Sequence, residues 1–270
     1  MNLNVVFYVL SRLQFAVSLS LCVPFAAALY WGEACAVDFA GTILVSLGIA
    51  VLLNNRGSLD HESLTIREAI AVTGIAWFLM PLVAALPFLA GHYLGVVDSI
   101  FEGVSGLTCT GGSVVRNLDA LPRSLILWRS ITHWIGGLGI IVIYIAMFPQ
   151  PGSGAARMFN AEGAGPVENR VVPRIKETAN ALLLIYIFFS VILTALLVIC
   201  GLEGFDAVNL AMSTIATGGF ATTNGSVGDF HNLSAEIVLI IFMLIGGGNF
   251  CLYFMALKKG CRHLWQNTEL

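Results

Sequence analysis

Six segments of this chain are too apolar and too long to belong to the core of a soluble domain. The 270-residue chain is 57% hydrophobic and only 11% charged, and its mean hydropathy is +0.87, whereas a soluble domain carries about 25% charged residues. A bilayer core of roughly 30 Å needs about 20 mostly apolar residues per helix. The sequence therefore predicts an all-α integral membrane protein. The expected spans cover residues 3–30, 37–54, 66–91, 124–148, 175–201 and 235–258.

Charge predicts the orientation of these spans. Basic residues gather in loops on one side, which the positive-inside rule assigns to the cytoplasm. Both termini are then cytoplasmic, the first span is expected to be retained and not cleaved, and the lipid bilayer is the expected surrounding. The net charge of −3 gives no reason to expect nucleic acid. The cytoplasmic set is Arg56, Arg67, Arg157, Arg170, Arg174, Lys176, Lys258, Lys259 and Arg262.

Two shorter segments lie between the spans, at residues 97–107 and 205–215. They are too short to cross a bilayer as helices, so both must start from the outer face and return to it. Asp98 and Asp206 open them, and we expect both carboxylates to act as helix N-caps. Each segment runs into a polar stretch that contains glycine, "TCTGGS" in the first and "ATGGFATT" in the second.

The chain repeats itself with a period of about 108 residues. At that shift Asp98 meets Asp206, Ser105 meets Ser213 and Gly111 meets Gly219. The repeated unit is a span, a re-entrant helix with a polar loop, and a second span. Both copies have the same orientation, as in parallel repeats related by an axis along the membrane normal. We expect a two-helix membrane segment at 1–60, a first unit at 61–150 and a second unit at 151–270.

The polar loops predict a cation site made of main chain. Non-helical backbone at membrane depth is tolerated only when it is buried in protein or lines water, and potassium filters use carbonyl oxygens in place of the ion's hydration shell. Glycine lets two backbones approach closely. The alternative is that both loops are simple glycine-rich turns. The expected K⁺ ligands are the backbone carbonyls of Thr108, Cys109, Thr110, Gly111, Ala216, Thr217, Gly218 and Gly219, with no cofactor.

Charged side chains inside a membrane span are functional candidates. Arg129 lies close to the outer end of the fourth span, and Glu102 on the first re-entrant helix is its expected partner in a structural ion pair. His133 is expected to be a buried hydrogen-bonding group. Glycines inside the fourth and sixth spans are expected to allow close helix packing or a bend. They are Gly136, Gly137, Gly139 and Gly246 to Gly248.

The sequence gives little support to an enzyme. A membrane hydrolase or transferase would need a cluster such as Ser with His, or His with Asp, at membrane depth. His133 is the one histidine placed well inside a span, and the others fall in loops or near helix ends. The six cysteines are scattered, mostly inside apolar segments, without the spacing of a metal site or a disulfide framework.

Several long motifs resemble a known family. "FEGVSGLTCTGG", "LPRSLILWRSITHWIGGLGII", "VPRIKETANALLLIYI", "FDAVNLAMSTIATGGF" and "FMLIGGGNF" are similar to the TrkH-like membrane subunits of bacterial potassium uptake systems, in the Trk/Ktr/HKT superfamily. The resemblance implies a pseudo-fourfold pore of four units, with one filter glycine from each, and makes Gly111 and Gly219 two of the four. It also implies potassium transport across the bacterial inner membrane and a cytosolic nucleotide-binding regulatory partner.

The chain departs from the family pattern in two ways. Position 109 is Cys where the family pattern has Thr, and only two units are present. The resemblance therefore implies half of a pore, which a second copy, or a second polypeptide that supplies the C-terminal half, would complete. The alternative is a truncated or split, non-conducting fragment that needs a complementary half. Glycine at both filter positions resembles the potassium-selecting arrangement, since a Ser in the first unit of some plant relatives accompanies sodium transport.

Overall fold

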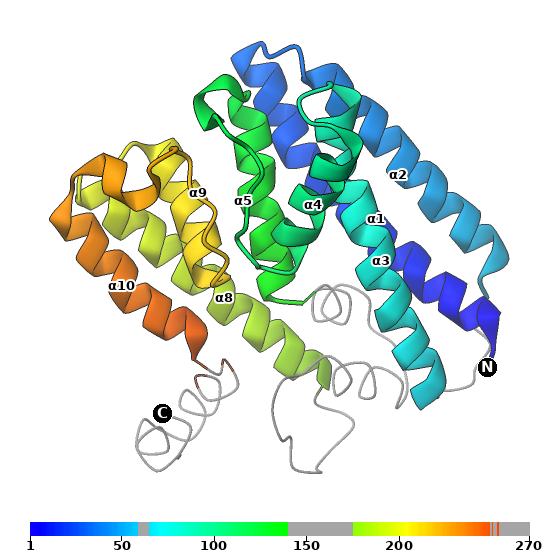
Figure 1. Cartoon of the computed structure of the whole chain (residues 1–270). Coiled ribbons are helices and arrows are strands. Elements are labelled where there is room, and N and C mark those ends of the chain that lie inside the picture. Colours follow the sequence, from blue (N-terminus) through cyan, green and yellow to red (C-terminus); the bar gives the residue numbers. More distant parts are fainter. Residues whose placement is uncertain (59–64, 140–174, 249, 251–252, 254–270) are drawn as a thin grey trace.

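The computed structural model describes residues 1–58, 65–139, 175–248, 250 and 253 (Figure 1). Within these ranges every regular element is a helix and no strand occurs, as the all-α prediction requires. Two of the helices have only 12 residues, and two short 3-10 turns lie in loops. The α-helices are α1 (Leu3–Trp31), α2 (Ala36–Arg56), α3 (Ile66–Ala90), α4 (Val96–Leu107), α5 (Arg123–Gly137), α8 (Ile175–Ile199), α9 (Gly204–Ile215) and α10 (Leu233–Gly247).

Four of these helices are long and apolar enough to cross a membrane. They cover Leu3–Trp31, Ala36–Arg56, Arg67–Ala90 and Ala179–Ile199, close to the first, second, third and fifth predicted spans. The start of α3 is fixed by a capping box, in which Thr65 accepts a hydrogen bond from the amide of Glu68 and the Glu68 carboxylate accepts one from the amide of Thr65. Reciprocal bonds of this kind satisfy amides that a helix N-terminus leaves unpaired. The chain is thus a multi-pass membrane protein.

The helices α5 and α10 end earlier than the fourth and sixth spans that the sequence predicts. The helix expected over 124–148 ends at Gly137, and the helix expected over 235–258 ends at Gly247. The remainder of both predicted spans lies almost entirely outside the described residues. The first glycine of each IGG motif does allow close packing, since Gly136 lies against the carbonyl of Leu107 and Gly246 against that of Ile215.

Helices α3–α4–α5 and α8–α9–α10 follow one another in the same order, each as a long helix, a 12-residue helix and a 15-residue helix. At about 1.5 Å per residue, 12 residues extend roughly 18 Å, which is short of a bilayer core. Figure 1 shows α4 and α9 starting at the end of the molecule opposite the N-terminus and pointing inward, with their loops returning to that same end. This matches the expected re-entrant geometry.

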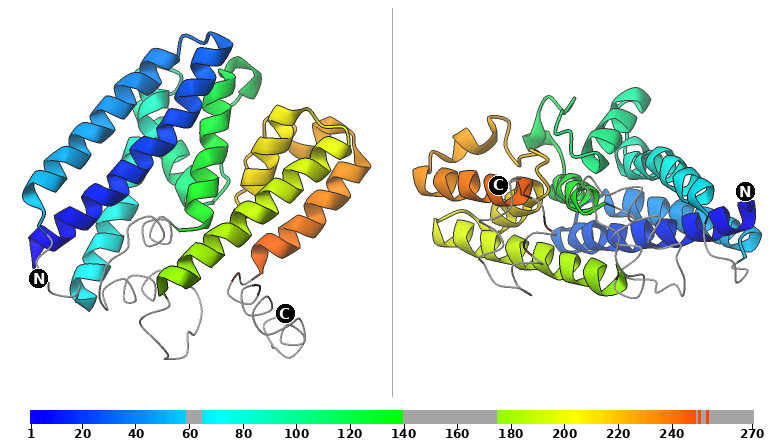
Figure 2. Two further views of the ribbon diagram at one scale, coloured as in Figure 1. Left: turned by 180° about the vertical axis from the view of Figure 1, so that it is seen from behind. Right: turned by 90° about the horizontal axis from the view of Figure 1, so that it is seen from below.

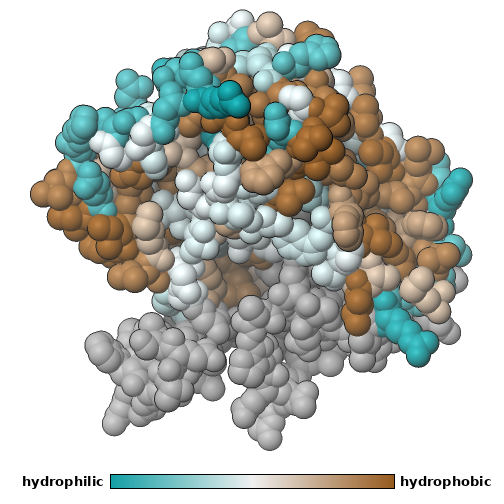
Figure 3. Space-filling view, in the orientation of Figure 1, coloured by the Kyte–Doolittle hydropathy of each residue, from teal (hydrophilic) through white to brown (hydrophobic). Residues whose placement is uncertain are grey.

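The two groups of helices have separate cores and meet where α5 packs on α9. One core joins α1, α2, α3 and α5, and the other joins α8, α9 and α10 (Figure 2). Trp128 on α5 donates its indole N–H to the carbonyl of Ala84 on α3 at 2.9 Å, which ties α5 to the first group. In Figure 3, apolar side chains cover both flanks, hydrophilic ones gather at the upper end, and a pale strip of near-neutral residues runs between the flanks.

Candidate functional site

The first short helix ends in a backbone motif that starts the polar loop. The amide of Thr110 donates to the carbonyl of Ser105 at 3.0 Å, and the amide of Cys109 donates to that of Gly106 at 3.2 Å. This pair of bonds is a Schellman motif, which requires a left-handed residue just beyond the helix. Cys109 takes that conformation with φ +52°, and Gly111 is left-handed again at φ +73°.

The second short helix ends in the same way. The amides of Gly218 and Thr217 donate to the carbonyls of Ser213 and Thr214, both at 2.9 Å. Thr217 has φ +54° and Gly219 has φ +98°. The left-handed positions of the two loops are therefore 108 residues apart, as the sequence repeat is. A left-handed conformation at a non-glycine residue is uncommon, so its recurrence at equivalent positions marks a specified loop shape and not an arbitrary turn.

The backbone carbonyls at the start of each loop accept no hydrogen bond from the described residues of the protein. Across the described part of the chain, no donor is bonded to the carbonyl oxygens of residues 108–111 or 216–219. Thr108, Thr110, Thr217 and Gly219 are exposed, and Ala216 and Gly218 are buried, so the loops border open space and are not packed inside a core. Eight carbonyls in two equivalent loops therefore present acceptor capacity that the protein itself leaves unused, at the ends of helices whose C-termini carry partial negative charge.

The two loops contact each other through glycine. A side chain on Gly111 would collide with the carbonyl oxygen of Gly218, and its Cβ would lie 3.5 Å from the Cα of Gly219. The sequence repeat pairs Gly111 with Gly219, and the structure brings both together with Gly218. Gly111 meets two requirements at once, since its φ is positive and its α-carbon faces neighbouring backbone.

Arg129 and Glu102 form a buried ion pair beside the first loop. The Arg129 Nε atom lies 2.8 Å from Glu102 Oε1, and the two side chains are 3% and 0% exposed. Glu102 is the partner expected from the sequence. Its carboxylate also accepts hydrogen bonds from the Ser113 hydroxyl at 2.9 Å and the Val114 amide at 3.2 Å. Arg129 Nη2 completes the network by donating to Ser113 Oγ at 3.0 Å.

The same arginine also reaches the second loop. Its Nη1 donates to the carbonyl of Ala221 at 3.4 Å, and the guanidinium carbon lies 4.0 Å from the centre of the Phe220 ring. One turn further along α5, the His133 ring stacks on Phe220 with 3.9 Å between centroids and 18° between planes. Helix α5 of the first unit therefore holds parts of both loops.

The predicted N-caps are wrong. Gly95 and Glu203 occupy the N-cap positions of α4 and α9, and neither helix has a side-chain cap. Asp98 and Asp206 lie in the first turn instead. Asp206 accepts a hydrogen bond from Thr222 Oγ1 at 2.6 Å, so its carboxylate anchors the chain beyond the second loop.

Several contacts near the site involve residues that the sequence did not single out. They include Ser113, Phe220, Ala221 and Thr222, which lie just beyond the loops. The sequence marks Ser213 only as the repeat partner of Ser105. Ser113 and Thr222 pair with residues 16 positions away, and Phe220 and Ala221 contact Arg129 from more than 90 positions away. Neither kind of pairing has a local sequence signal, although the polar residues after each glycine pair indicate a loop with tertiary bonds.

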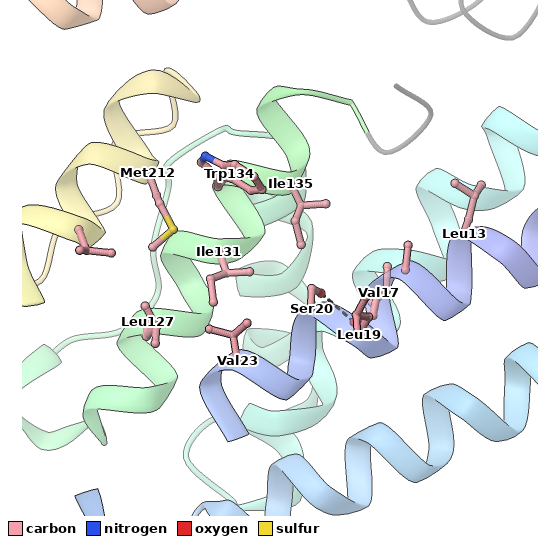
Figure 4. A pocket seen from close by; sticks show the side chains of 12 residues that line it. Leu13, Val17, Leu19, Ser20, Val23, Leu127, Ile131, Trp134, Ile135 and Met212 are labelled. Atoms are coloured by element: carbon pink, nitrogen blue, oxygen red, sulfur yellow. Dashed lines mark hydrogen bonds between the residues drawn. The ribbon is translucent and has the colours of Figure 1, made fainter. Parts of the chain in front are cut away.

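An apolar groove lies apart from the loops. Its volume is about 430 Å³, and Figure 4 shows it between α1, α5 and α9, lined by side chains such as Val17, Val23, Ile131 and Met212. Ser20, a polar lining residue, donates its hydroxyl to the carbonyl of Val17 at 2.7 Å. Apart from Ser20, the side chains that line this groove are apolar or aromatic. No group of three His, Cys, Asp or Glu side chains that could hold a metal occurs in the described ranges.

Comparison with known proteins identifies relatives along almost the whole chain. The family model TrkH, described as "Cation transport protein", matches residues 39–268. The Trk system potassium uptake protein TrkH of Escherichia coli is 34% identical over 254 residues, which cover 93% of this chain and 53% of the relative. The protein of the same name from Halomonas elongata is 30% identical over 273 residues, covering 100% of this chain and 57% of the relative.

A solved structure is similar to the whole fold. The crystal structure of the potassium transporter TrkH from Vibrio parahaemolyticus has a TM-score of 0.83 and 29% sequence identity, and the match covers 99% of this chain and 55% of that one. These relatives are transport proteins by name and not enzymes. The chain spans about half the length of the curated relatives it matches.

Proposed function

Because the chain belongs to the TrkH family of cation transport proteins, we propose that it carries potassium across a membrane along a path lined by residues 108–111 and 216–219. The backbone carbonyls of these residues replace water around the dehydrated ion. The residues that supply them are Thr108, Cys109, Thr110, Gly111, Ala216, Thr217, Gly218 and Gly219. The proposal concerns transport and not catalysis.

One observation carries the proposal. Four consecutive carbonyls in each of two contacting, equivalent loops lack internal hydrogen bonds. Each loop follows a short helix that points its C-terminus inward, and such an end carries partial negative charge that favours a cation. The nearby Arg129 would repel a cation if it were alone, but Glu102 pairs with it. The electrostatics of the loops are therefore set by main-chain dipoles.

Two loops supply part of a ring around an ion. We propose that further loops come from a second copy of this chain or from a polypeptide that supplies a complementary half. We also propose an inner-membrane location with the N-terminus in the cytoplasm and, by the family resemblance, a cytosolic nucleotide-binding regulatory subunit. The end of α2 and the start of α3 lie at the same end of the molecule as the N-terminus (Figure 1), and they carry the exposed Arg56 and Arg67, which supports that orientation.

Rubidium flux into liposomes tests the function, with purified chain reconstituted alone and after chemical cross-linking. We expect uptake that potassium inhibits more strongly than sodium, and we expect Gly111→Ser to weaken that preference. Ser130→Ala is the matched control, because its hydroxyl bonds only to the carbonyl of Ile126 in its own helix. An unchanged preference in Gly111→Ser contradicts the assignment of the loops.

The outcome also separates the pore proposal from its alternative. Flux from cross-linked dimers supports completion by a second copy. Absence of flux, followed by recovery when the C-terminal half of a full-length relative is co-reconstituted, supports a non-conducting piece that requires a complementary half. Absence of flux under both conditions contradicts potassium transport by this chain.

A further inference from the structure

His133 lies directly behind the second loop. It is 0% exposed on α5, and a side chain on Gly218 would collide with its Nδ1 atom. The imidazole therefore fills the space that the missing side chain of Gly218 leaves. Since α5 belongs to the first unit and Gly218 to the second, this packing joins the two units next to the proposed ion path.

Two hydrogen bonds, both made by the Ser213 hydroxyl, connect the His133 imidazole to the backbone of the second loop. His133 Nδ1 lies 3.0 Å from Ser213 Oγ, and the amide of Gly219 donates to the same oxygen at 3.0 Å. A hydroxyl has one proton and two lone pairs. Ser213 can accept from the Gly219 amide while it donates to Nδ1, or accept from both nitrogens when the imidazole proton is on Nδ1, so either tautomer keeps the link between His133 and Gly219.

The first loop is tied to the same residue. The Cys109 thiol donates to the backbone carbonyl of His133 at 3.3 Å. The equivalent serine of the first unit makes a different bond, since Ser105 Oγ donates to the carbonyl of Gly112 at 2.5 Å. The two loops therefore share a shape but are held by different side-chain contacts, and His133 contacts both of them.

The second unit has no counterpart of this arrangement. At the shift of 110 residues that aligns the two IGG motifs, His133 matches Met243 and Arg129 matches Leu239. Both counterparts are apolar. The polar side chains that contact a neighbouring loop are therefore specific to α5 and are not part of the repeat. The first unit contacts the loop of the second unit through them, and the matching positions of α10 carry no polar side chain.

We propose that His133 is a positioning residue that holds the Gly219 amide through Ser213 and thereby sets the carbonyl geometry of the second loop. The expected effect of this contact on the choice between potassium and sodium rests on the proposed function. His133 does not contact the ion. It acts by fixing the peptide units that do, so a change in it alters selectivity without removing any carbonyl.

Three variants test the contact itself, in nanodiscs that hold the whole chain. His133→Phe keeps a flat ring against Phe220 and removes the Nδ1 atom that bonds to Ser213. Ser213→Ala removes the hydroxyl that connects His133 to the Gly219 amide. His133→Asn places an amide oxygen near the position of Nδ1 and is the conservative rescue. Hydrogen exchange of the Gly219 amide, whose resonance is assigned by its loss in Gly219→Ala, reports the bond without any flux.

We expect exchange at Gly219 to be about tenfold faster in His133→Phe and Ser213→Ala, no faster in the double variant than in either single one, and near wild type in His133→Asn. Ser130→Ala removes a buried hydroxyl from the same helix and leaves exchange unchanged. In flux-competent liposomes the potassium-to-sodium preference falls by about threefold to tenfold in the two disruptive variants.

Either of two results overturns the inference. One is unchanged Gly219 exchange in both His133→Phe and Ser213→Ala. The other is faster exchange with an unchanged potassium-to-sodium preference. A wild-type chain that takes up no rubidium counts against the proposed function instead, and in that case the exchange comparison alone decides whether His133 positions the loop.

Discussion

The α-carbon of Gly111 faces the carbonyl oxygen of Gly218, so closely that no side chain fits between them. These residues are 107 positions apart and belong to different repeats. Their contact brings two equivalent loops together at the ends of two short helices. Since both loops have free carbonyls, this contact places the acceptors of the two units side by side.

Gly111→Ala is expected to destabilise the protein more than Gly219→Ala. Both residues have positive φ, which costs a non-glycine residue about 1–2 kcal/mol. The added methyl group at Gly111 also collides with Gly218, whereas the position next to Gly219 is open. Thermal unfolding in detergent measures the difference, and equal losses in the two variants would contradict the close approach.

Removal of either partner of the buried ion pair is expected to cost about 3–5 kcal/mol, because the other charge is left buried and unpaired. We expect Arg129→Gln and Glu102→Gln each to lower the free energy of unfolding, and the double variant to lose less than the sum of the two. Arg116→Gln, at an exposed position in the same loop, is the control. Additive losses would mean that the 2.8 Å contact contributes little.

Glu33 is expected to stabilise the start of α5. Its carboxylate accepts hydrogen bonds from the amides of Arg123 at 2.8 Å and Ser124 at 3.1 Å, although it lies 90 residues away in sequence. Loss of a capping group costs about 1 kcal/mol. Glu33→Ala should therefore speed hydrogen exchange of those two amides. Glu203→Ala, at an N-cap position without a side-chain bond, should leave its own helix unaffected.

Cys35 is expected to react slowly with thiol reagents at neutral pH. Burial raises the pKa of its thiol to about 11, and the carboxylate of Glu33 adds to the rise. A raised pKa means less thiolate, and the thiolate is the nucleophile. Labelling of a single-cysteine variant should increase steadily between pH 8 and pH 11. The Glu33→Ala variant should label faster at pH 8, and no change there would remove the electrostatic explanation.

The helices and the repeat could be predicted because segment composition and sequence period can be read along the chain without knowledge of tertiary contacts. Apolar segments of about 20 residues predict spans, and the lengths and positions of α4 and α9 followed from two short segments that end in glycine-rich stretches. The sequence does not predict the breaks that end α5 and α10 inside the fourth and sixth spans, and most of the remaining residues of these spans lie outside the described part of the chain. Hydropathy continues through both IGG motifs, whereas α5 ends at Gly137 and α10 at Gly247, where glycine is the least favourable helix residue after proline.

The sequence by itself determined a membrane protein of apolar helices with two equivalent, glycine-bearing loops, since composition, segment length and period are properties of the chain read in order. Only the tertiary structure decided which groups meet: Gly111 with Gly218, Arg129 with both loops, and His133 with Ser213 and, through it, Gly219. Such contacts depend on how helices pack around one another. Packing brings together residues separated by 80 or more positions, and no local pattern of residues specifies that pairing.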